Sequence, residues 1–192
     1  MQDFGFYFEL GWHHIIDWGA VDHLLFITAL SAVYLLGNWR QVLVLVTAFT
    51  IGHSLTLALS VYDIIRINSR WVEFLIPCTI IATAVFNFSQ RNFQPRSLRL
   101  NYLLALFFGL IHGLGFANAI RFILAKDQRI GWSLFGFNVG LEAGQILVVL
   151  GILFISYAVV NIAGIKRKWW IWGLSAITFC IASKMVWERW PD

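Results

Sequence analysis

The sequence has few charged residues and almost no cysteine. Only 12% of its 192 residues are Asp, Glu, Lys or Arg, about half the share that a soluble globular domain carries. This shortage excludes an ordinary soluble domain, and a net charge of +4 spread over short loops provides no nucleic-acid surface. The two cysteines, Cys78 and Cys180, lack the paired spacing of a zinc or redox motif, so we expect both to be small core residues.

Hydrophobic residues, in contrast, make up 59% of the chain and gather in long runs. A helix needs about 20 such residues to cross the hydrocarbon core of a bilayer. We therefore expect an all-α polytopic membrane helical bundle of about six transmembrane helices, forming one domain over residues 1–192. After an interfacial lead-in at 1–19, the expected spans are 20–37, 42–62, 71–88, 100–120, 131–160 and 169–187.

An Asp-His pair lies at the start of the first expected span. The purely apolar run from Leu24 to Leu36 is too short to cross a bilayer, so the span must also include Asp22 and His23. Ionisable residues inside a membrane are costly and are functional by default. His14 lies two turns upstream on the helical face of Asp22. An imidazole and a carboxylate on one face can bind a divalent cation, or the carboxylate can hold the second imidazole nitrogen in place.

Gly19 complicates this segment because it can break it into two helices. His13 and Asp17 would then belong to the upstream helix, where headgroups can accommodate polar side chains. We expect these two residues to be peripheral, either as a first station for the ion or as headgroup anchors. Asp22 and His23 would begin the spanning helix.

Two more histidines lie near the middle of expected spans. His53 lies within the second span, and His112 lies in the fourth among Gly109, Gly113 and Gly115. Small residues such as these allow another helix to approach closely. A histidine in the middle of a membrane needs a partner, so each of these positions is a candidate ligand.

The fifth expected span has two distinct faces. Gly136, Gly140 and Gly144 repeat every four residues on one face, and a polar row occupies the opposite one: Asn138, Glu142 and Gln145. The glycines are expected to pack against another helix. The polar row predicts a lined cavity or an ion path, with a single protonated core acid at Glu142 as the alternative.

These residue types suit a divalent transition-metal ion. Imidazole and carboxylate donors without a thiolate cluster fit nickel, cobalt, copper and zinc alike. No single helix could supply three or four ligands, so we expect donors from different helices to converge near the midplane in an incomplete shell. The expected metal ligands are His14, Asp22, His23, His53, His112 and Glu142, with His13, Asp17, Asn138 and Gln145 as weaker candidates.

Two other functions stay open at this point. A haem-binding membrane electron carrier could use His53 and His112 as axial ligands, although Asp22 and Glu142 have no axial role. A non-catalytic partner or scaffold protein would leave the buried ionisable residues unexplained. We do not expect an enzyme, because adjacent helical residues such as His53 and Ser54 diverge by about 100° and no protease motif is present.

Four segments in order resemble the HupE/UreJ family, and most closely its second branch. They are D-H-L-L-F from Asp22, V-T-A-F-T-I-G-H-S-L-T-L-A-L from Val46, F-G-L-I-H-G-L-G-F-A from Phe108 and F-N-V-G-L-E-A-G-Q from Phe137. The resemblance covers nearly the whole chain and implies a nickel or cobalt permease, accessory to hydrogenase and urease. It marks as functional His14, Asp22, His23, His53, His112 and Glu142, and more weakly Asn138 and Gln145.

One departure from the family concerns its opening motif. The family's usual opening has a proline after the histidine and a shorter run to the Asp-His pair. Here Ile15 follows His14, and seven residues separate His14 from Asp22. The expected setting is a bacterial inner membrane, with the bilayer and the metal-ion substrate as partners; a homo-oligomer or another membrane partner stays open. Basic residues tie between the two sides, and the distribution of loop acids leads us to expect both termini outside the cytoplasm.

Overall fold

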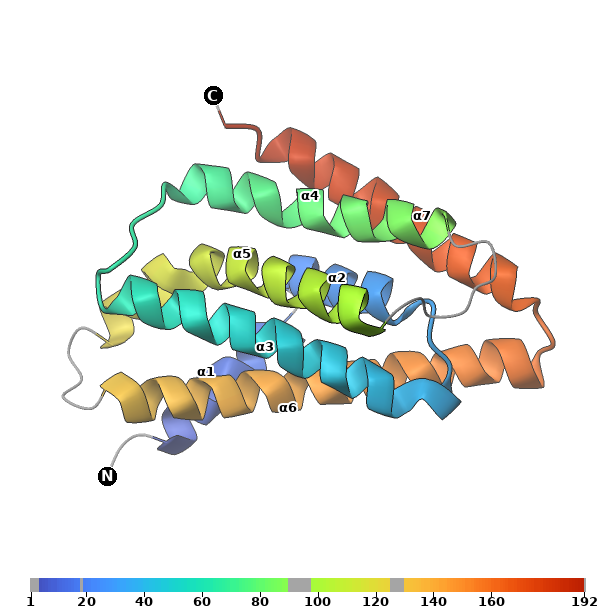
Figure 1. Ribbon diagram of the computed structural model, residues 1–192, viewed down its shortest axis with the longest axis horizontal. Coiled ribbons are helices and arrows are strands. Elements are labelled where there is room, and N and C mark those ends of the chain that lie inside the picture. Colours follow the sequence, from blue (N-terminus) through green and yellow to red (C-terminus); the bar gives the residue numbers. More distant parts are fainter. Residues whose placement is uncertain (1–3, 18, 90–97, 125–129, 192) are drawn as a thin grey trace.

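A computed structural model describes residues 4–17, 19–89, 98–124 and 130–191 (Figure 1). Within these ranges the chain forms seven α-helices and no strand, which confirms the all-α prediction. The helices are α1 (Phe4–Ile16), α2 (Val21–Ser31), α3 (Trp39–Val61), α4 (Ser69–Phe88), α5 (Leu98–Leu124), α6 (Ile130–Tyr157) and α7 (Arg167–Glu188), with a 3₁₀ turn η1 at Leu36–Asn38 and a π-helical turn η2 at Ala158–Ile162.

Four helical segments in the described part of the chain are long and apolar enough to cross a membrane. They contain α3, α4, α6 and α7, and two shorter apolar helical segments accompany them, Val21–Ser31 and Asn101–Ala117. The chain is therefore an integral membrane protein. The expected number of about six spans is approximate, because two of the apolar helices are short. Both ends of the chain lie in the left half of Figure 1, where α3 ends and α4 begins.

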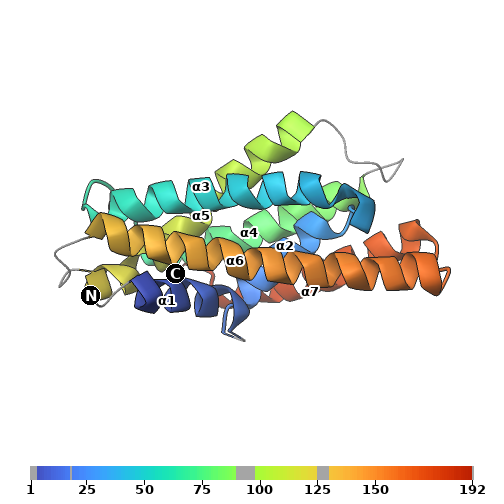
Figure 2. The same ribbon diagram turned by 90° about the horizontal axis from the view of Figure 1, so that it is seen from below.

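The expected lead-in and the expected first span form two short helices, α1 and α2. α2 has 11 residues, so at 1.5 Å per residue it is about 16 Å long, roughly half of the hydrocarbon core. α1 packs along the first part of α6 and α2 lies farther along the same helix (Figure 2). Residues 1–3 and 18 of the expected lead-in lie outside the described residues, and Ile15 of α1 is completely buried.

The break between α1 and α2 has a local cause. The Asp17 carboxylate accepts a hydrogen bond from the Gly19 backbone N–H at 3.3 Å, and the Asp17 carbonyl accepts one from Ala20 at 2.9 Å. Short polar side chains that bond to nearby backbone compete with helix continuation. This geometry ends α1 and confirms that the segment is divided near Gly19.

Glycines allow α1 to approach the backbone of α6. A Cβ atom at Gly140 would lie 2.0 Å from the Phe8 carbonyl oxygen, and one at Gly11 would lie 2.0 Å from that of Phe137. No side chain fits at these two positions, so each glycine lies directly against the backbone of the other helix. The predicted packing role of the α6 glycine row is confirmed, since Gly136 and Gly144 also contact α1.

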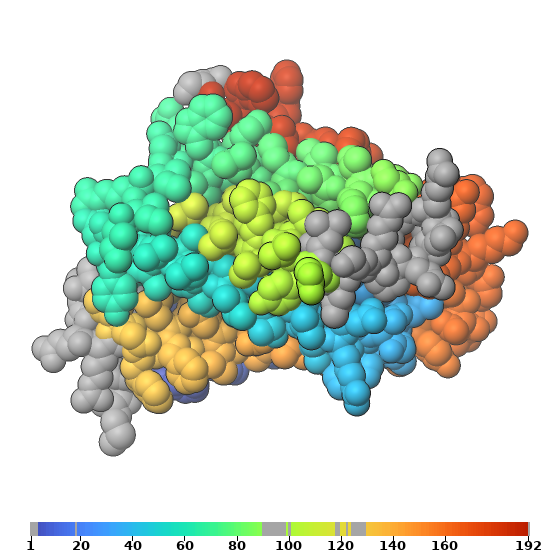
Figure 3. Space-filling model, viewed as in Figure 1, coloured from blue at the N-terminus to red at the C-terminus, as the bar shows by residue number. Residues whose placement is uncertain are grey.

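α3 and α5 make a second contact of this kind, and they run parallel. A Cβ atom at Gly109 would lie 2.2 Å from the Phe49 carbonyl oxygen, and one at Gly113 would lie 2.3 Å from that of His53. On one face of the molecule α5 lies between α3 and α4 (Figure 3). This packing places the middle of α5, with His112, beside the middle of α3.

The outer surface of the bundle carries many large apolar side chains, as a surface in contact with lipid requires. Cys180 belongs to this surface because it is exposed on α7, while Cys78 is half-buried on α4. The expectation of two core cysteines is therefore wrong for Cys180. In a membrane helix both lipid-facing and core-facing positions are apolar, so an apolar neighbourhood does not indicate burial.

Candidate metal centre

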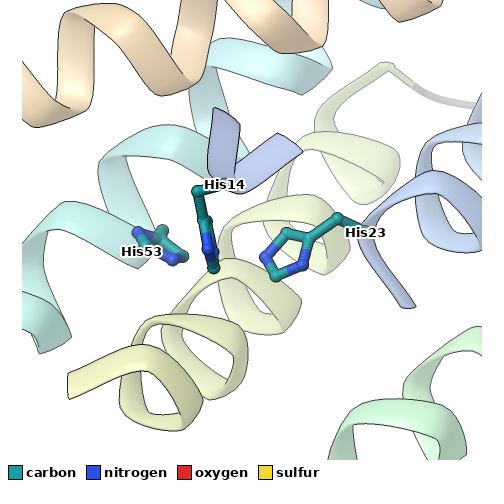
Figure 4. Close-up of side chains that lie close together, drawn as sticks. All are labelled: His14, His23 and His53. Atoms are coloured by element: carbon teal, nitrogen blue, oxygen red, sulfur yellow. The ribbon is translucent and has the colours of Figure 1, made fainter. Parts of the chain in front are cut away.

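Three histidines from three helices meet inside the bundle (Figure 4). His14 lies in the last turn of α1, His23 in the first turn of α2 and His53 in the interior of α3. Each offers one ring nitrogen, and these three nitrogens all lie within 4.8 Å of one another. His53 is fully buried and His23 is 4% exposed, so the cluster is shielded from solvent on most sides.

The helix break brings two of these residues together. In a continuous helix His14 and His23 would be about 13 Å apart along the axis, since each residue adds 1.5 Å. Because the chain turns between α1 and α2, their ring centroids are only 4.6 Å apart. The turn between α1 and α2 therefore brings these two histidines of the site together.

His112 of α5 adds a fourth imidazole. Its ring centroid lies 5.3 Å from that of His23, and its Nδ1 lies 2.8 Å from the Phe108 carbonyl oxygen. A carbonyl oxygen can only accept, so Nδ1–H is the donor and Nε2 keeps its lone pair. We call His14, His23, His53 and His112 the histidine layer.

Asp22 orients His23 in the same way. Its Oδ1 lies 3.0 Å from Nδ1 of His23, so the imidazole donates through Nδ1 and its Nε2 is free to coordinate. A carboxylate or carbonyl behind an imidazole is the usual arrangement around a metal-binding histidine, because it fixes the tautomer and the ring orientation. Two of the four histidines are therefore prepared for coordination through Nε2.

Several ring nitrogens of the histidine layer have no partner. Among the described residues no hydrogen bond reaches five buried atoms: Nε2 of His14, His23 and His112, and both nitrogens of His53. Leaving a buried polar atom unpaired costs about 1–3 kcal/mol. So many unpaired atoms in one place make the histidine layer a candidate binding site for a ligand that is not part of the chain.

The donor geometry is close to that of a metal shell. A metal–nitrogen bond of about 2.0–2.1 Å means that two donors on one ion are at most about 4.2 Å apart. The observed limit of 4.8 Å between the three histidine nitrogens is slightly wider. Movements of less than about 1 Å would bring the three nitrogens to coordination distance from one ion. The donors are therefore already close together but slightly too far apart to share an ion.

A first cavity of about 460 Å³ leads to the histidine layer. His14, His23 and His112 form its inner wall, while exposed residues lie nearer its mouth: His13, Asp17 and Glu73. The His13 side chain is 64% exposed and lies 3.8 Å from Glu9. The structure thus places His13 and Asp17 at the periphery of the site, whereas His14 is among its central residues.

A layer of phenylalanines closes the other side of the histidine layer. Phe26, Phe49 and Phe108 each lie one helical turn from a histidine of the same helix, on α2, α3 and α5. Ring centroids are 4.9 Å apart for Phe26 and Phe49, and 5.9 Å apart for Phe26 and Phe108. We call these three residues the phenylalanine layer. It separates the first cavity from the opposite end of the bundle.

A second cavity of about 190 Å³ lies beyond the phenylalanine layer. Phe108 lines it, and the other lining residues lie on α2, α4 and α5, apart from Val33 and Tyr34, which lie just after α2. Its polar residues are buried: Tyr34, Thr83, Asn87 and Asn101. Asn87 donates to the Ala29 carbonyl at 2.7 Å and Asn101 donates to the Tyr34 hydroxyl at 3.0 Å.

The polar row of α6 is in a different place. Glu142 accepts a hydrogen bond from the Thr47 hydroxyl at 2.7 Å, and Gln145 accepts one from Thr50 at 2.8 Å. These bonds join α6 to α3, opposite the glycine contacts with α1. Neither cavity wall includes Glu142, Gln145 or Asn138. The structure brings together His14, Asp22, His23, His53 and His112, but it does not bring Glu142 to them.

The sequence patterns missed two charged residues of the first cavity. Glu73 lies at the start of α4 and Arg189 immediately follows α7, where charged residues commonly anchor helices in headgroups. The phenylalanine layer was missed as well, although its signal was present. Each of its members lies three or four positions from a candidate histidine.

Comparison with known proteins is informative at the family level. A protein-family model with the description HupE / UreJ protein matches residues 1–189, which is nearly the whole chain. Searches of curated proteins and of solved structures find no match.

Proposed function

This chain belongs to the HupE/UreJ family, and we propose that it carries a divalent transition-metal ion across the membrane through the histidine layer. The family is associated with nickel and cobalt, so these are the substrates proposed first; imidazole donors also suit copper and zinc. The observation that carries the proposal is the set of five buried, unpartnered ring nitrogens. They come from four separate helices, as a site inside a bundle requires.

The two cavities suggest a route for the ion. It would enter the first cavity past His13, Asp17 and Glu73, bind at the histidine layer, pass the phenylalanine layer and leave through the second cavity. Residues on α2, α4 and α5 line both cavities. The second cavity offers amide and hydroxyl oxygens that can replace part of the ion's water shell.

The arrangement corresponds to a carrier that is open on one side only. The first cavity reaches exposed residues, while the phenylalanine layer closes the way to the second. Transport would require the phenylalanines to separate after the ion binds. The helix break between α1 and α2 at the level of the site supports this, since transporters commonly bind their substrates where helices are interrupted.

Asp22 supplies negative charge next to the imidazoles. A dication that leaves water loses a large hydration energy, which neutral imidazoles alone do not offset. Asp22 contacts His23, and its side chain is 16% exposed. A carboxylate attached to the ligand set in this way compensates the charge of the ion without closing its coordination shell.

The other functions receive less support from the geometry. A haem would need a flat slot between two axial histidines, but the rings of His14, His23 and His53 pack tilted or edge to face with centroids 4.6–6.2 Å apart. Ser54 donates its hydroxyl proton to the Thr50 carbonyl at 2.6 Å, so it is engaged with backbone. We propose a carrier without enzymatic activity, in a bacterial inner membrane with both termini outside the cytoplasm.

Uptake into proteoliposomes tests the proposed function. The purified protein would be reconstituted and supplied separately with nickel, cobalt, copper and zinc, with empty liposomes and Lys184→Gln as controls. Lys184 pairs with Glu188 on α7 and does not line the first cavity. We expect uptake of at least one ion by the wild type and by the control variant, and loss of that uptake in His53→Leu. Uptake no higher than in empty liposomes for all four ions would refute the proposal.

A further inference from the structure

Arg189 reaches from the end of α7 into the first cavity. Its Nη1 lies 3.3 Å from Oδ2 of Asp22, while Oδ1 of the same carboxylate contacts His23. Asp22 therefore joins a guanidinium and a metal-site imidazole. The Asp22 side chain is 16% exposed and that of Arg189 is 31% exposed, so the pair lies between the buried site and the open part of the cavity.

The backbone that carries Arg189 is anchored on both sides. Its N–H donates to the Met185 carbonyl at 2.9 Å and completes the last turn of α7. The next residue, Trp190, packs edge to face on Phe74 of α4 with ring centroids 5.2 Å apart. A fixed backbone with a long, flexible side chain lets the guanidinium move while its attachment point stays in place.

We propose that Arg189 is an internal competitor of the metal ion: it holds the Asp22 carboxylate in the empty site and is displaced when a divalent cation binds. This inference rests on the proposed function. With Arg189 in place, the charge of Asp22 is already neutralised, and an incoming dication meets imidazoles without net negative charge. The ion must therefore displace the guanidinium from Asp22 before the negative charge of this carboxylate can compensate the charge of the ion.

Glu73 gives the displaced side chain a second partner. It lines the same cavity and precedes Phe74, on which Trp190 packs. The released guanidinium moves toward Glu73, which stays in the cavity wall. When Arg189 returns to Asp22 it neutralises the carboxylate again, and the site then binds the ion less tightly. The same residue therefore assists release of the ion. A carrier needs both steps, because an ion bound too tightly is not transported.

A purely structural role for Arg189 predicts the opposite sign. If the guanidinium only held Asp22 in position behind His23, its removal would loosen the ligand set and weaken metal binding. If Arg189 competes with the ion, its removal strengthens metal binding. The direction of the change therefore separates the two roles.

Titration of the detergent-purified full-length protein by calorimetry, with nickel first and with cobalt, copper and zinc in parallel, is the test. We expect Arg189→Gln to bind Ni²⁺ at least about tenfold more tightly than the wild type, equivalent to about 1.4 kcal/mol. In the Asp22→Asn background the same substitution should change the affinity by less than about twofold, because the competition acts through Asp22. In proteoliposomes Arg189→Gln should show a lower half-saturating concentration together with a lower maximal rate.

Lys184→Gln is the matched control, since it also removes one positive charge, in the last turns of α7 and outside the first cavity. Should Arg189→Gln not fold, Arg189→Met carries the same prediction. Equal or weaker Ni²⁺ binding by the Arg189 variant would overturn the inference, as would a gain that persists in the Asp22→Asn background. If neither the wild type nor Arg189→Gln binds any of the four ions, the proposed function fails, and this inference fails with it.

Discussion

The imidazoles of His14 and His23 face each other across a broken helix, with ring centroids 4.6 Å apart. His14 lies in the last turn of α1 and His23 in the first turn of α2. Membrane carriers often bind substrates at such interruptions, where backbone and side chains leave the regular helical pattern. Here residues of the turn also line the first cavity, which reaches from exposed residues to the buried site.

His53 allows stability and metal binding to be separated. It is fully buried and neither ring nitrogen has a partner among the described residues. Leucine has a similar volume and no polar atom, so His53→Leu should stabilise the metal-free protein by about 1–3 kcal/mol. Thermal unfolding with and without nickel would show this gain, together with the loss of stabilisation by the metal. A less stable metal-free variant would mean that the imidazole has a structural role.

Asp22 and Glu142 provide a comparison between two carboxylates. Asp22 touches the histidine layer, so Asp22→Asn should lower metal uptake at least about tenfold, or about 1.4 kcal/mol. Glu142 lies outside both cavities, and glutamine keeps an acceptor for Thr47, so we expect Glu142→Gln to retain uptake within about twofold. A tenfold loss in a folded Glu142→Gln protein would place the ion path along the polar row of α6.

The contact between α1 and α6 leads to a stability prediction with a control on the same helix. In Gly140→Ala the new Cβ would meet the Phe8 carbonyl oxygen at 2.0 Å, which should destabilise the protein by about 1–3 kcal/mol. Gly151→Ala has nothing within 4 Å of its Cβ and should be neutral or stabilising by up to about 1 kcal/mol. Equal melting temperatures in detergent would show that α1 is not held against α6 as described.

A cluster of charges at the end of α3 has a predictable pH dependence. Arg66 and Arg121 bond to the Asp63 carboxylate and hold its pKa at about 2, below the ordinary value of 3.8. A carboxyl group whose folded-state pKa is lowered stabilises the protein above the unfolded-state pKa, and this contribution is lost as the pH falls through the folded-state value. Asp63 also has a positive φ of 62°, which asparagine tolerates.

Asp63→Asn should therefore melt at a lower temperature than the wild type at neutral pH. The difference should shrink as the pH falls from about 4 to about 2. Added salt should reduce it as well, because the charges are exposed. Melting curves of both proteins over this pH range provide the check. A difference that does not change with pH would mean that the carboxylate charge has no part in joining this loop to α5.

Much of the fold can be predicted from the sequence, and so can most of the residues that make up the candidate site. Hydrophobic runs predict an all-helical membrane bundle because lipid requires apolar helices of a certain length. His23, His53 and His112 stand out because each is an ionisable residue in an apolar run, where it needs a partner. Helical periodicity also separates the glycine row of α6 from its polar row, and the structure confirms the packing of the glycines.

The missed features depend on contacts between distant segments. Periodicity shows which α6 residues share a face, but not that this face meets Thr47 and Thr50 rather than the histidines. Arg189 is 167 positions from Asp22, and a basic residue after a membrane helix looks like any headgroup anchor. The sequence suggests a break near Gly19, but the proximity of His14 to His23 depends on the direction that the chain takes afterwards.

X-ray absorption at the nickel edge of the loaded, purified protein tests the histidine layer most directly. We predict a shell with several imidazole nitrogens at about 2.0–2.1 Å, completed by oxygen from water, and a loss of imidazole scattering in His23→Ala and His53→Leu. A shell of oxygen atoms without imidazole, or an imidazole signal that both variants retain in full, would contradict the account.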